Sequence, residues 1–196
     1  MLASVRYYSL FNKKLLYFLI FFIFNFGLLI ADTKTNVIKK INGTSSITFE
    51  FIQNTNSKIE NGNCILLFPN KLKCVYNDDK LKELIINNQM LAITQKRYQK
   101  NYYYPLGKSS FAKIINKKEL IKLINLSEIE TNADQIIFTN IDKKERKTLI
   151  FFEPYTFNLK GWKFTDQFNN NIEFLIKINT LNEKFKIKEF EILKKD

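Results

Sequence analysis

Apolar and polar residues alternate along much of the chain after residue 45, which is the pattern of strands with one buried face. Ile47, Phe49 and Phe51 show this alternation first. Similar or short apolar runs predict further strands around residues 64–66, 72–76, 84–86, 91–93, 102–104, 136–138, 148–152, 157–164 and 172–178. Phe68-Pro69-Asn70-Lys71 and Asn87-Asn88-Gln89 are typical of tight turns between neighbouring strands. The pattern therefore predicts an antiparallel meander.

Two stretches have helical spacing instead. Residues 33–41 place Val37, Ile38 and Ile41 on one face, and Ser109–Leu126 repeats apolar residues behind Ser109 or Ser110 as a cap. Polar residues from Asn116 interrupt the second stretch, so one helix or two short ones fit it equally. A sheet of this many strands curls, and an apolar concave face needs a cover. The predicted fold class is mainly β with an α insertion, an incomplete antiparallel β-barrel (a curved sheet) covered by a helical lid.

The first 31 residues have the pattern of a secretory signal. Arg6, Lys13 and Lys14 precede an almost wholly apolar run from Leu15 to Ala31, and no acidic residue occurs before Asp32. The run approaches the roughly 20 residues that span a bilayer, so a retained anchor is the alternative. Asn25 and Gly27 weaken the run near its end. We therefore expect cleavage near Ala31, which divides the chain into a signal peptide, 1–31, and one exported domain, 32–196.

Charge and composition exclude several function classes. Without the three basic residues of the signal, 28 Lys and Arg face 19 Asp and Glu, a net charge of +9. These charges are scattered, and export argues against a nucleic-acid partner. The chain has no histidine and only five glycines, which removes histidine-based nucleophile and metal sites and phosphate-binding loops. Asp78 and Asp79 fit a solvated turn. The spacing of Glu128 and Glu130 fits an acid/base pair, but same-face alternation along a strand explains it as well. We expect no enzyme, no cofactor and no metal.

Two cysteines, Cys64 and Cys74, lie on the two arms of the hairpin around Pro69. They have the same parity as Leu66 and Leu72 and so point to the same face. If paired residue numbers sum to 138, the cysteines lie directly opposite each other and can form a disulfide, whereas a two-residue slip makes them diagonal. The pattern leaves a disulfide and two buried thiols both open.

Several segments of the chain are similar, in order and spacing, to the motifs of one known family. The segment from Gly62 to Tyr76, Gly-Asn-Cys-Ile-Leu-Leu-Phe-Pro-Asn-Lys-Leu-Lys-Cys-Val-Tyr, is similar to a hairpin with the pattern Gly-x-Leu-x-Leu-x-Arg-Pro-Gly-Lys-x-Arg-Trp-x-Tyr. Ile47–Gln53 resembles a first strand that ends in Phe-x-Gln, and Tyr104-Pro105-Leu106 precedes the helical insertion as in many members. Leu159–Asp166 with Ile172–Phe174 resembles the C-terminal hairpin, and Phe190 the closing strand. Together, from about Thr44 to Ile192, these motifs resemble the family of periplasmic lipoprotein carriers called LolA.

The resemblance implies a half-barrel that encloses an apolar cavity and carries the acyl chains of lipoproteins from the inner to the outer membrane. The implied partners are acylated lipoprotein cargo, an inner-membrane ABC transporter of the LolCDE type and an outer-membrane acceptor of the LolB type, with the protein itself a monomer in the periplasm. An exported module that senses lipid or lipoprotein is the alternative function, and a membrane-anchored lipid-binding protein is a third.

The inward-facing positions of the predicted strands and helices predict which residues line this cavity. The predicted wall comprises Ile47, Phe49, Phe51, Leu66, Leu72, Tyr76, Leu84 and Ile86. The predicted lid comprises Phe111, Ile114, Ile115, Leu120, Leu123 and Ile124. Phe68 stands where the family has an Arg that is associated with holding the lid, Cys74 stands for its Trp, and Asn88-Gln89 for its Asp-Gly turn. These departures leave open how a lid would be held.

Overall fold

The structure, a computed structural model, describes residues 32–107, 110–143, 145–166 and 169–192. The predicted signal segment, 1–31, lies outside the described residues. By its internal contacts the chain divides into Met1–Asn36 and Val37–Asp196, and the fold below is that of the second unit. Among the described residues, no helix combines the length and apolar character needed to cross a membrane.

Three α-helices are described, and their positions confirm the predicted helical stretches. The first covers residues 32–42, and its Val37 and Ile41 are buried. The insertion forms two short helices, α2 (Ser110–Ile115) and α3 (Lys117–Leu126). Asn116 separates them because its side-chain oxygen accepts a hydrogen bond from the Glu119 N–H, which makes it the N-cap of α3.

Eleven described strands form one antiparallel sheet, in which each strand is hydrogen-bonded to its neighbours. In chain order the strands are β1 (Ser46–Thr55), β2 (Lys58–Leu67), β3 (Lys71–Tyr76), β4 (Lys82–Asn87), β5 (Met90–Gln95), β6 (Lys100–Pro105), β7 (Glu128–Thr131), β8 (Ile136–Ile141), β9 (Lys147–Phe152), β10 (Leu159–Thr165) and β11 (Asn171–Leu181). Two 3₁₀ helices, η1 (Lys96–Tyr98) and η2 (Ile187–Phe190), complete the described elements.

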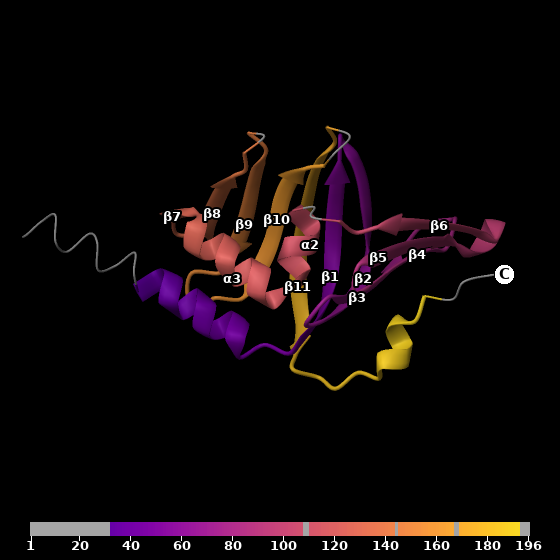
Figure 1. The fold of residues 1–196 in the computed structure, drawn as a ribbon, viewed down its shortest axis with the longest axis horizontal. Helices are drawn as coiled ribbons and strands as arrows, with labels where there is room; N and C mark the ends of the chain where they lie inside the picture. The colour runs from indigo at the N-terminus through magenta and orange to yellow at the C-terminus, as the bar shows by residue number, and fades with distance from the viewer. Residues whose placement is uncertain (1–31, 108–109, 144, 167–168, 193–196) are drawn as a thin grey trace, which may run out of the picture. The chain divides into compact units, whose positions relative to one another are not determined.

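The sheet consists of two meanders joined at its centre. The strand order is β6-β5-β4-β3-β2-β1-β11-β10-β9-β8-β7, so only the pairing of β1 with β11 joins strands distant in sequence. The sheet is curved and does not close, because β6 and β7 remain its two outer strands (Figure 1). This arrangement confirms the predicted fold class of a curved antiparallel sheet with a helical insertion.

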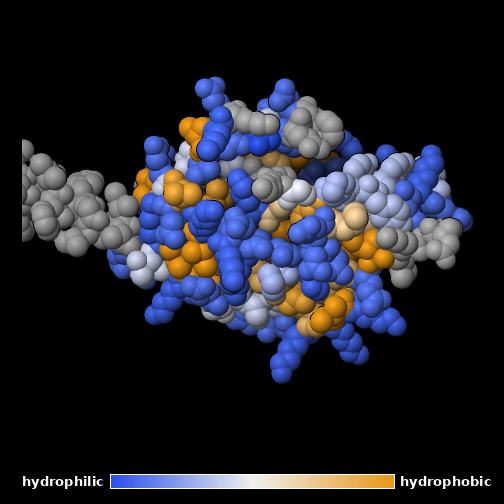
Figure 2. All heavy atoms as spheres, viewed as in Figure 1, coloured by the Kyte–Doolittle hydropathy of each residue, from blue (hydrophilic) through white to orange (hydrophobic). Residues whose placement is uncertain are grey.

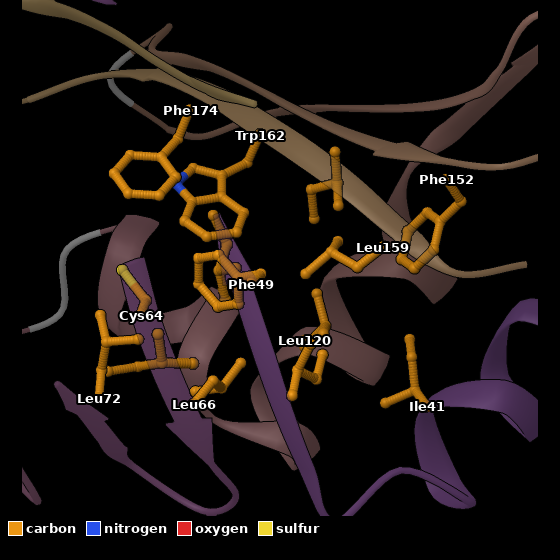
Figure 3. Close-up of a cluster of buried hydrophobic side chains, with 14 of the residues drawn as sticks. Ile41, Phe49, Cys64, Leu66, Leu72, Leu120, Phe152, Leu159, Trp162 and Phe174 are labelled. Atoms are coloured by element: carbon orange, nitrogen blue, oxygen red, sulfur yellow. The ribbon is translucent and has the colours of Figure 1, made fainter. Parts of the chain in front are cut away.

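The main hydrophobic core lies between the concave face of the sheet and the insertion. Ile114, Ile115, Leu120 and Ile124 of the two helices are fully buried there. They pack in one cluster with inward residues from both meanders, including Phe49, Leu66, Leu72, Phe152, Leu159, Trp162 and Phe174 (Figure 3). The helices therefore cover the concave face, as the apolar parity of the strands required.

A second, smaller contact lies on the other face of the first meander. The 3₁₀ helix η2 packs against β3 and β4, and Phe190 is completely buried although it is not part of the main core. The Asn87 side chain donates a hydrogen bond from Nδ2 to the Phe190 carbonyl at 3.2 Å. Asn87 follows the concave Ile86 and so points to the opposite, convex face. The C-terminal segment thus packs on the convex side.

Candidate functional site

A cavity of about 230 Å³ lies between the first meander and β10–β11, beside α2. Its walls are almost wholly apolar, with Gln53, Tyr76 and Lys82 as the polar exceptions. The lining residues are Gln53, Leu72, Cys74, Tyr76, Lys82, Leu84, Leu91, Ile93, Phe111, Trp162, Phe164, Ile172 and Phe174. Leu84, Leu91, Phe111 and Ile172 are only partly buried against the core, so the cavity is an opening at the end of the core.

Part of the predicted set lines this cavity. Of the predicted wall, Leu72, Tyr76 and Leu84 do so, and of the predicted lid, Phe111 does. Ile47 and Leu120 instead line a small gap of about 20 Å³ beneath the first helix. The remaining predicted residues are buried in the core: Phe49, Phe51, Leu66, Ile86, Ile114, Ile115, Leu123 and Ile124. The assignment of all these residues to acyl binding stays a prediction.

The far wall is formed by residues that local sequence patterns did not nominate. Trp162 and Phe174 stack with ring centroids 4.8 Å apart (Figure 3), and the ring centroid of Phe111 lies 6.0 Å from that of Trp162. Phe51 stacks on the other side of Phe174 at 4.6 Å. The available signal was the resemblance of Leu159–Asp166 and Ile172–Phe174 to the family's C-terminal hairpin, which contains both Trp162 and Phe174. The helical Phe111 thus closes onto an aromatic wall.

Trp162 also carries an unsatisfied polar atom. Its side chain is 1% exposed, and its indole Nε1 has no hydrogen-bond partner among the described residues. Indole N–H groups are donors only, and a buried donor without a partner costs free energy. Trp162 lines the cavity, but its Nε1 is enclosed by protein atoms and does not open into the cavity.

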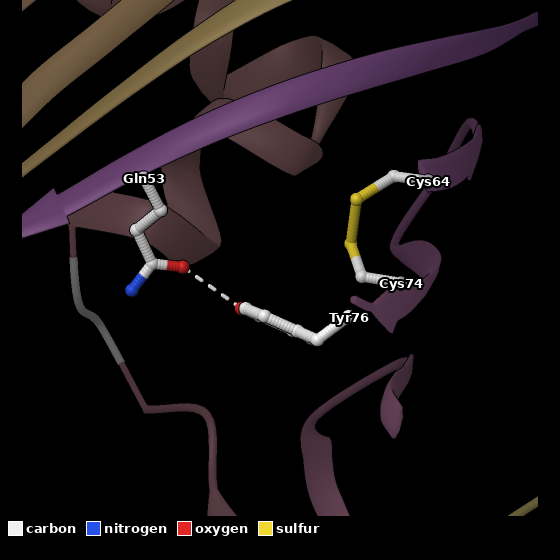
Figure 4. Close-up of a disulfide and its surroundings, with 4 residues drawn as sticks. All are labelled: Gln53, Cys64, Cys74 and Tyr76. Carbon is white, nitrogen blue, oxygen red and sulfur yellow. Dashed lines mark hydrogen bonds between the residues drawn. A yellow bond between two sulfur atoms is a disulfide. The ribbon is translucent and has the colours of Figure 1, made fainter. Parts of the chain in front are cut away.

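A disulfide between β2 and β3 lies in the wall opposite the aromatic rings. Cys64 pairs directly with Cys74 in the ladder, which is the register whose residue numbers sum to 138, and a disulfide joins the two (Figure 4). Of the two, Cys74 lines the cavity. The bond therefore fixes two neighbouring strands at the point where the cavity begins.

Gly62 makes room for the aromatic pair at the cavity's inner end. A Cβ at this position would come within 2.9 Å of Cε1 of Phe51 and 2.1 Å of the Val75 carbonyl oxygen. Without it, the rings of Phe51 and Tyr76 meet edge to face with centroids 4.9 Å apart. The Tyr76 hydroxyl then donates a hydrogen bond to Oε1 of Gln53 at 2.8 Å (Figure 4).

A partly buried ion pair forms the polar rim of the cavity. Nζ of Lys82 lies 2.6 Å from Oε1 of Glu60 and 3.6 Å from the ring centroid of Tyr76. Burial raises the pKa of Tyr76, and the negative charges of Glu60 and Asp78 raise it further, so its hydroxyl remains a neutral donor. Burial alone would raise the pKa of Glu60, but hydrogen bonds from Lys82 and Lys58 lower it. The rim cation is therefore neutralised within the protein.

The junction of α2 and α3 is attached to the β2–β3 turn through Asn70. The Asn70 N–H donates to the Ile115 carbonyl at 3.2 Å, and Nδ2 of Asn116 donates to Oδ1 of Asn70 at 2.8 Å. Asn70 has a φ of +62°, a conformation that asparagine tolerates. Nζ of Lys117 lies 5.4 Å from the ring centroid of Phe68. Two amide side chains thus hold the helices at a turn in which the resembled family has an arginine.

No group of three or more His, Cys, Asp or Glu residues that could hold a metal ion occurs in the described part of the chain. The site therefore offers an apolar volume and a polar rim whose charges are neutralised within the protein. Such an arrangement suits a long apolar ligand that carries few polar groups.

Comparisons with known proteins bear on the family and the fold. Residues 42–193 match the family model described as "Outer membrane lipoprotein carrier protein LolA", and no curated protein matches the chain significantly. An uncharacterized conserved protein from Thermus thermophilus is 6% identical, covers 83% of this chain and 94% of its own, and superimposes with a TM-score of 0.53, a likeness of fold. A LolA superfamily protein from Nitrosomonas europaea is 9% identical over 82% and 98% of the two chains with a TM-score of 0.46. For the Mycobacterium tuberculosis lipoprotein LppX the values are 9%, 81%, 98% and 0.47.

Proposed function

This chain belongs to the family of the outer membrane lipoprotein carrier protein LolA, and on that premise we propose that it carries the acyl chains of lipoproteins in the cavity beside α2. The observation that supports the proposal most is the apolar cavity of about 230 Å³ between the first meander, β10–β11 and α2. Natural cores leave few voids larger than a water molecule, so an open apolar cavity of this size suits a ligand.

Energetics explain why such a carrier is needed. Exposing an acyl chain to water costs about 0.8 kcal/mol per methylene, so about 15 methylenes cost on the order of 12 kcal/mol. A carrier must offset much of this cost and still release the chain. Pockets for drug-sized ligands usually have about 300–1,000 Å³, so this cavity widens when a whole chain enters. Phe111 is the residue of the short helix α2 that lines the cavity. A movement of α2 away from the sheet would therefore widen the cavity.

Location and partners complete the proposal. We infer that the segment 1–31 is a signal peptide cleaved near Ala31 and that the domain 32–196 works in the periplasm as a monomer. The disulfide between Cys64 and Cys74 supports this location, because disulfides persist in oxidising compartments. Cargo would come from an inner-membrane ABC transporter of the LolCDE type and pass to the outer membrane, directly or through a LolB-type acceptor. No catalytic step is part of this function.

Co-purification tests the proposal. The protein is isolated from the periplasm, and the bound material is identified by mass spectrometry, for the unmodified protein, for Leu84→Asp in the cavity wall and for Ile52→Asp. Ile52 is 55% exposed and outside the cavity, so its variant is the matched control. We expect triacylated lipoprotein with the unmodified protein and with Ile52→Asp, but not with Leu84→Asp. Free phospholipid alone, or no lipid, would count against a lipoprotein carrier and favour the sensing module.

A further inference from the structure

The edge of the first meander combines tyrosines with basic residues. The ten residues from Lys96 to Pro105 contain three basic residues, four tyrosines and no acidic residue. Tyr98, Tyr102, Tyr103 and Tyr104 each expose between 39% and 53% of their surface, and β6 is an outer strand of the sheet. This segment lies at the pale surface beside β6 in the right half of Figure 2.

Two of these tyrosines extend the cavity wall. In the β5–β6 ladder Tyr102 lies opposite Ile93 and Tyr104 opposite Leu91, and both partners line the cavity. Residues directly opposite in an antiparallel pair point to the same face. The side chains of Tyr102 and Tyr104 therefore continue the apolar wall of the cavity outward to the exposed edge, and we call Leu91, Ile93, Tyr102 and Tyr104 the tyrosine track.

The positive charges beside the track differ in their partners. Lys82 and Lys96 are paired with Glu60 and Glu83, at 2.6 Å and 3.0 Å. Arg97 and Lys100, by contrast, have no carboxylate of a described residue within 4.0 Å. Lys100 has the same strand parity as Tyr102, and hence the same face. Lys100 thus lies on the face of the track, and Arg97 precedes it by three residues in the β5–β6 connection, both without a neutralising carboxylate of a described residue.

We propose that this edge docks on the surface of an anionic bilayer and that the tyrosine track guides an acyl chain between the bilayer and the cavity. Tyrosine rings favour the headgroup level of membranes, where one end is apolar and the other wet. Basic residues near a surface attract anionic lipids. A strand added from another protein would use the backbone of β6 and needs neither the cations nor the continuity with the cavity. The guiding role relies on the proposed function, since it presumes that the cavity takes acyl chains.

Vesicle binding and lipid transfer test this inference separately. Vesicles of phosphatidylcholine, alone or mixed with an equal part of phosphatidylglycerol, carry pyrene-labelled palmitate, and both co-flotation and the rate of probe uptake are measured. The variants are Arg97→Gln/Lys100→Gln and Tyr102→Ser/Tyr104→Ser. Their matched controls are Lys147→Gln/Lys177→Gln and Tyr155→Ser, which are exposed positions on other elements. Every variant carries the same N-terminal segment, so the affinity of that segment cancels in the ratios.

Loss of the two cations should weaken binding to the phosphatidylglycerol vesicles about thirtyfold, since one basic residue near a membrane is worth about fivefold. Loss of the two tyrosines should slow uptake from vesicles but leave the affinity for palmitate added in solution unchanged. Added salt should weaken the binding of the unmodified protein to the phosphatidylglycerol vesicles, and this measurement needs no variant.

The inference would be overturned if the unmodified protein bound both kinds of vesicle equally and Arg97→Gln/Lys100→Gln bound them as strongly as the unmodified protein. That result would leave β6 as an edge for a strand of another protein. If palmitate in solution does not bind at all, the proposed acyl-binding function fails, whereas the vesicle binding still reports on the docking surface.

Discussion

The disulfide between Cys64 and Cys74 allows a quantitative prediction about stability. The two cysteines are 10 residues apart in sequence. A bond that closes a loop of that length removes chain entropy from the unfolded state and so stabilises the fold by about 2.7 kcal/mol. In a domain of this size 1 kcal/mol corresponds to about 2–4 °C in Tm. Reduction should therefore lower the Tm by about 5–11 °C.

The perturbation must change only the bond. Both cysteines are buried, so the protein is reduced in denaturant, refolded with the reductant present and compared with the oxidised protein by thermal unfolding followed by circular dichroism. No atom other than two hydrogens differs between the two samples. The double variant Cys64→Ala/Cys74→Ala is the control, because reductant should leave its Tm unchanged.

Two results would contradict the predicted loss of stability. Two free thiols in the alkylated, unreduced protein would mean that the bond does not form in the cell. Identical Tm values for the oxidised and fully reduced samples would mean that β2 and β3 already pair in the unfolded chain, because the bond then restricts nothing further.

Two further predictions concern the rim and the helix junction. Glu60 has a lowered pKa, so its pairing with Lys82 stabilises the fold above the unfolded pKa of about 4.5, and this stabilisation is lost as the pH falls through the folded pKa. The difference in unfolding free energy between the unmodified protein and Glu60→Gln, measured by urea unfolding at pH 3 to 7, should therefore vanish at the acid end. A difference that does not depend on pH would contradict this. Asn116→Ser keeps a cap for α3 but is too short to reach Asn70, so it should cost about 1 kcal/mol and speed hydrogen exchange in α2, whereas Asn116→Ala loses both contacts and should cost about 2 kcal/mol. Exchange in α2 of Asn116→Ser at the unmodified rate would show that Asn70 does not hold the helices.

Local patterns in the sequence predicted much of the fold. The Pro69-Asn70 turn and the parity of Leu66 and Leu72 were sufficient to predict the β2–β3 hairpin and its inward face. They left two registers open, and the structure has the one in which Cys64 lies opposite Cys74. The periodicity of the insertion indicated helices, but whether one or two formed depended on Asn116, whose capping hydrogen bond ends the ambiguity. These features involve neighbours in the sequence, so the sequence displays them directly.

The residues that line the cavity were harder to predict from such local patterns. Parity shows that Phe49 and Leu84 face inward, but not that Phe49 is packed into the core and Leu84 lines the opening. That difference depends on which strands of the second meander lie opposite. Trp162 and Phe174 reach the cavity only because β11 pairs with β1, a pairing between distant segments that no local periodicity encodes.

The central ladder between β1 and β11 also has a consequence for the order of folding. It pairs Ile47 with Leu181 and Thr55 with Ile172, whereas every other ladder joins strands that follow each other along the chain. Contacts between distant segments close large loops and form late. Each meander can therefore assemble by local steps, and the seam between them comes last. A chain that crosses a membrane unfolded, as the proposed export requires, cannot complete its cavity until its C-terminal strand has followed.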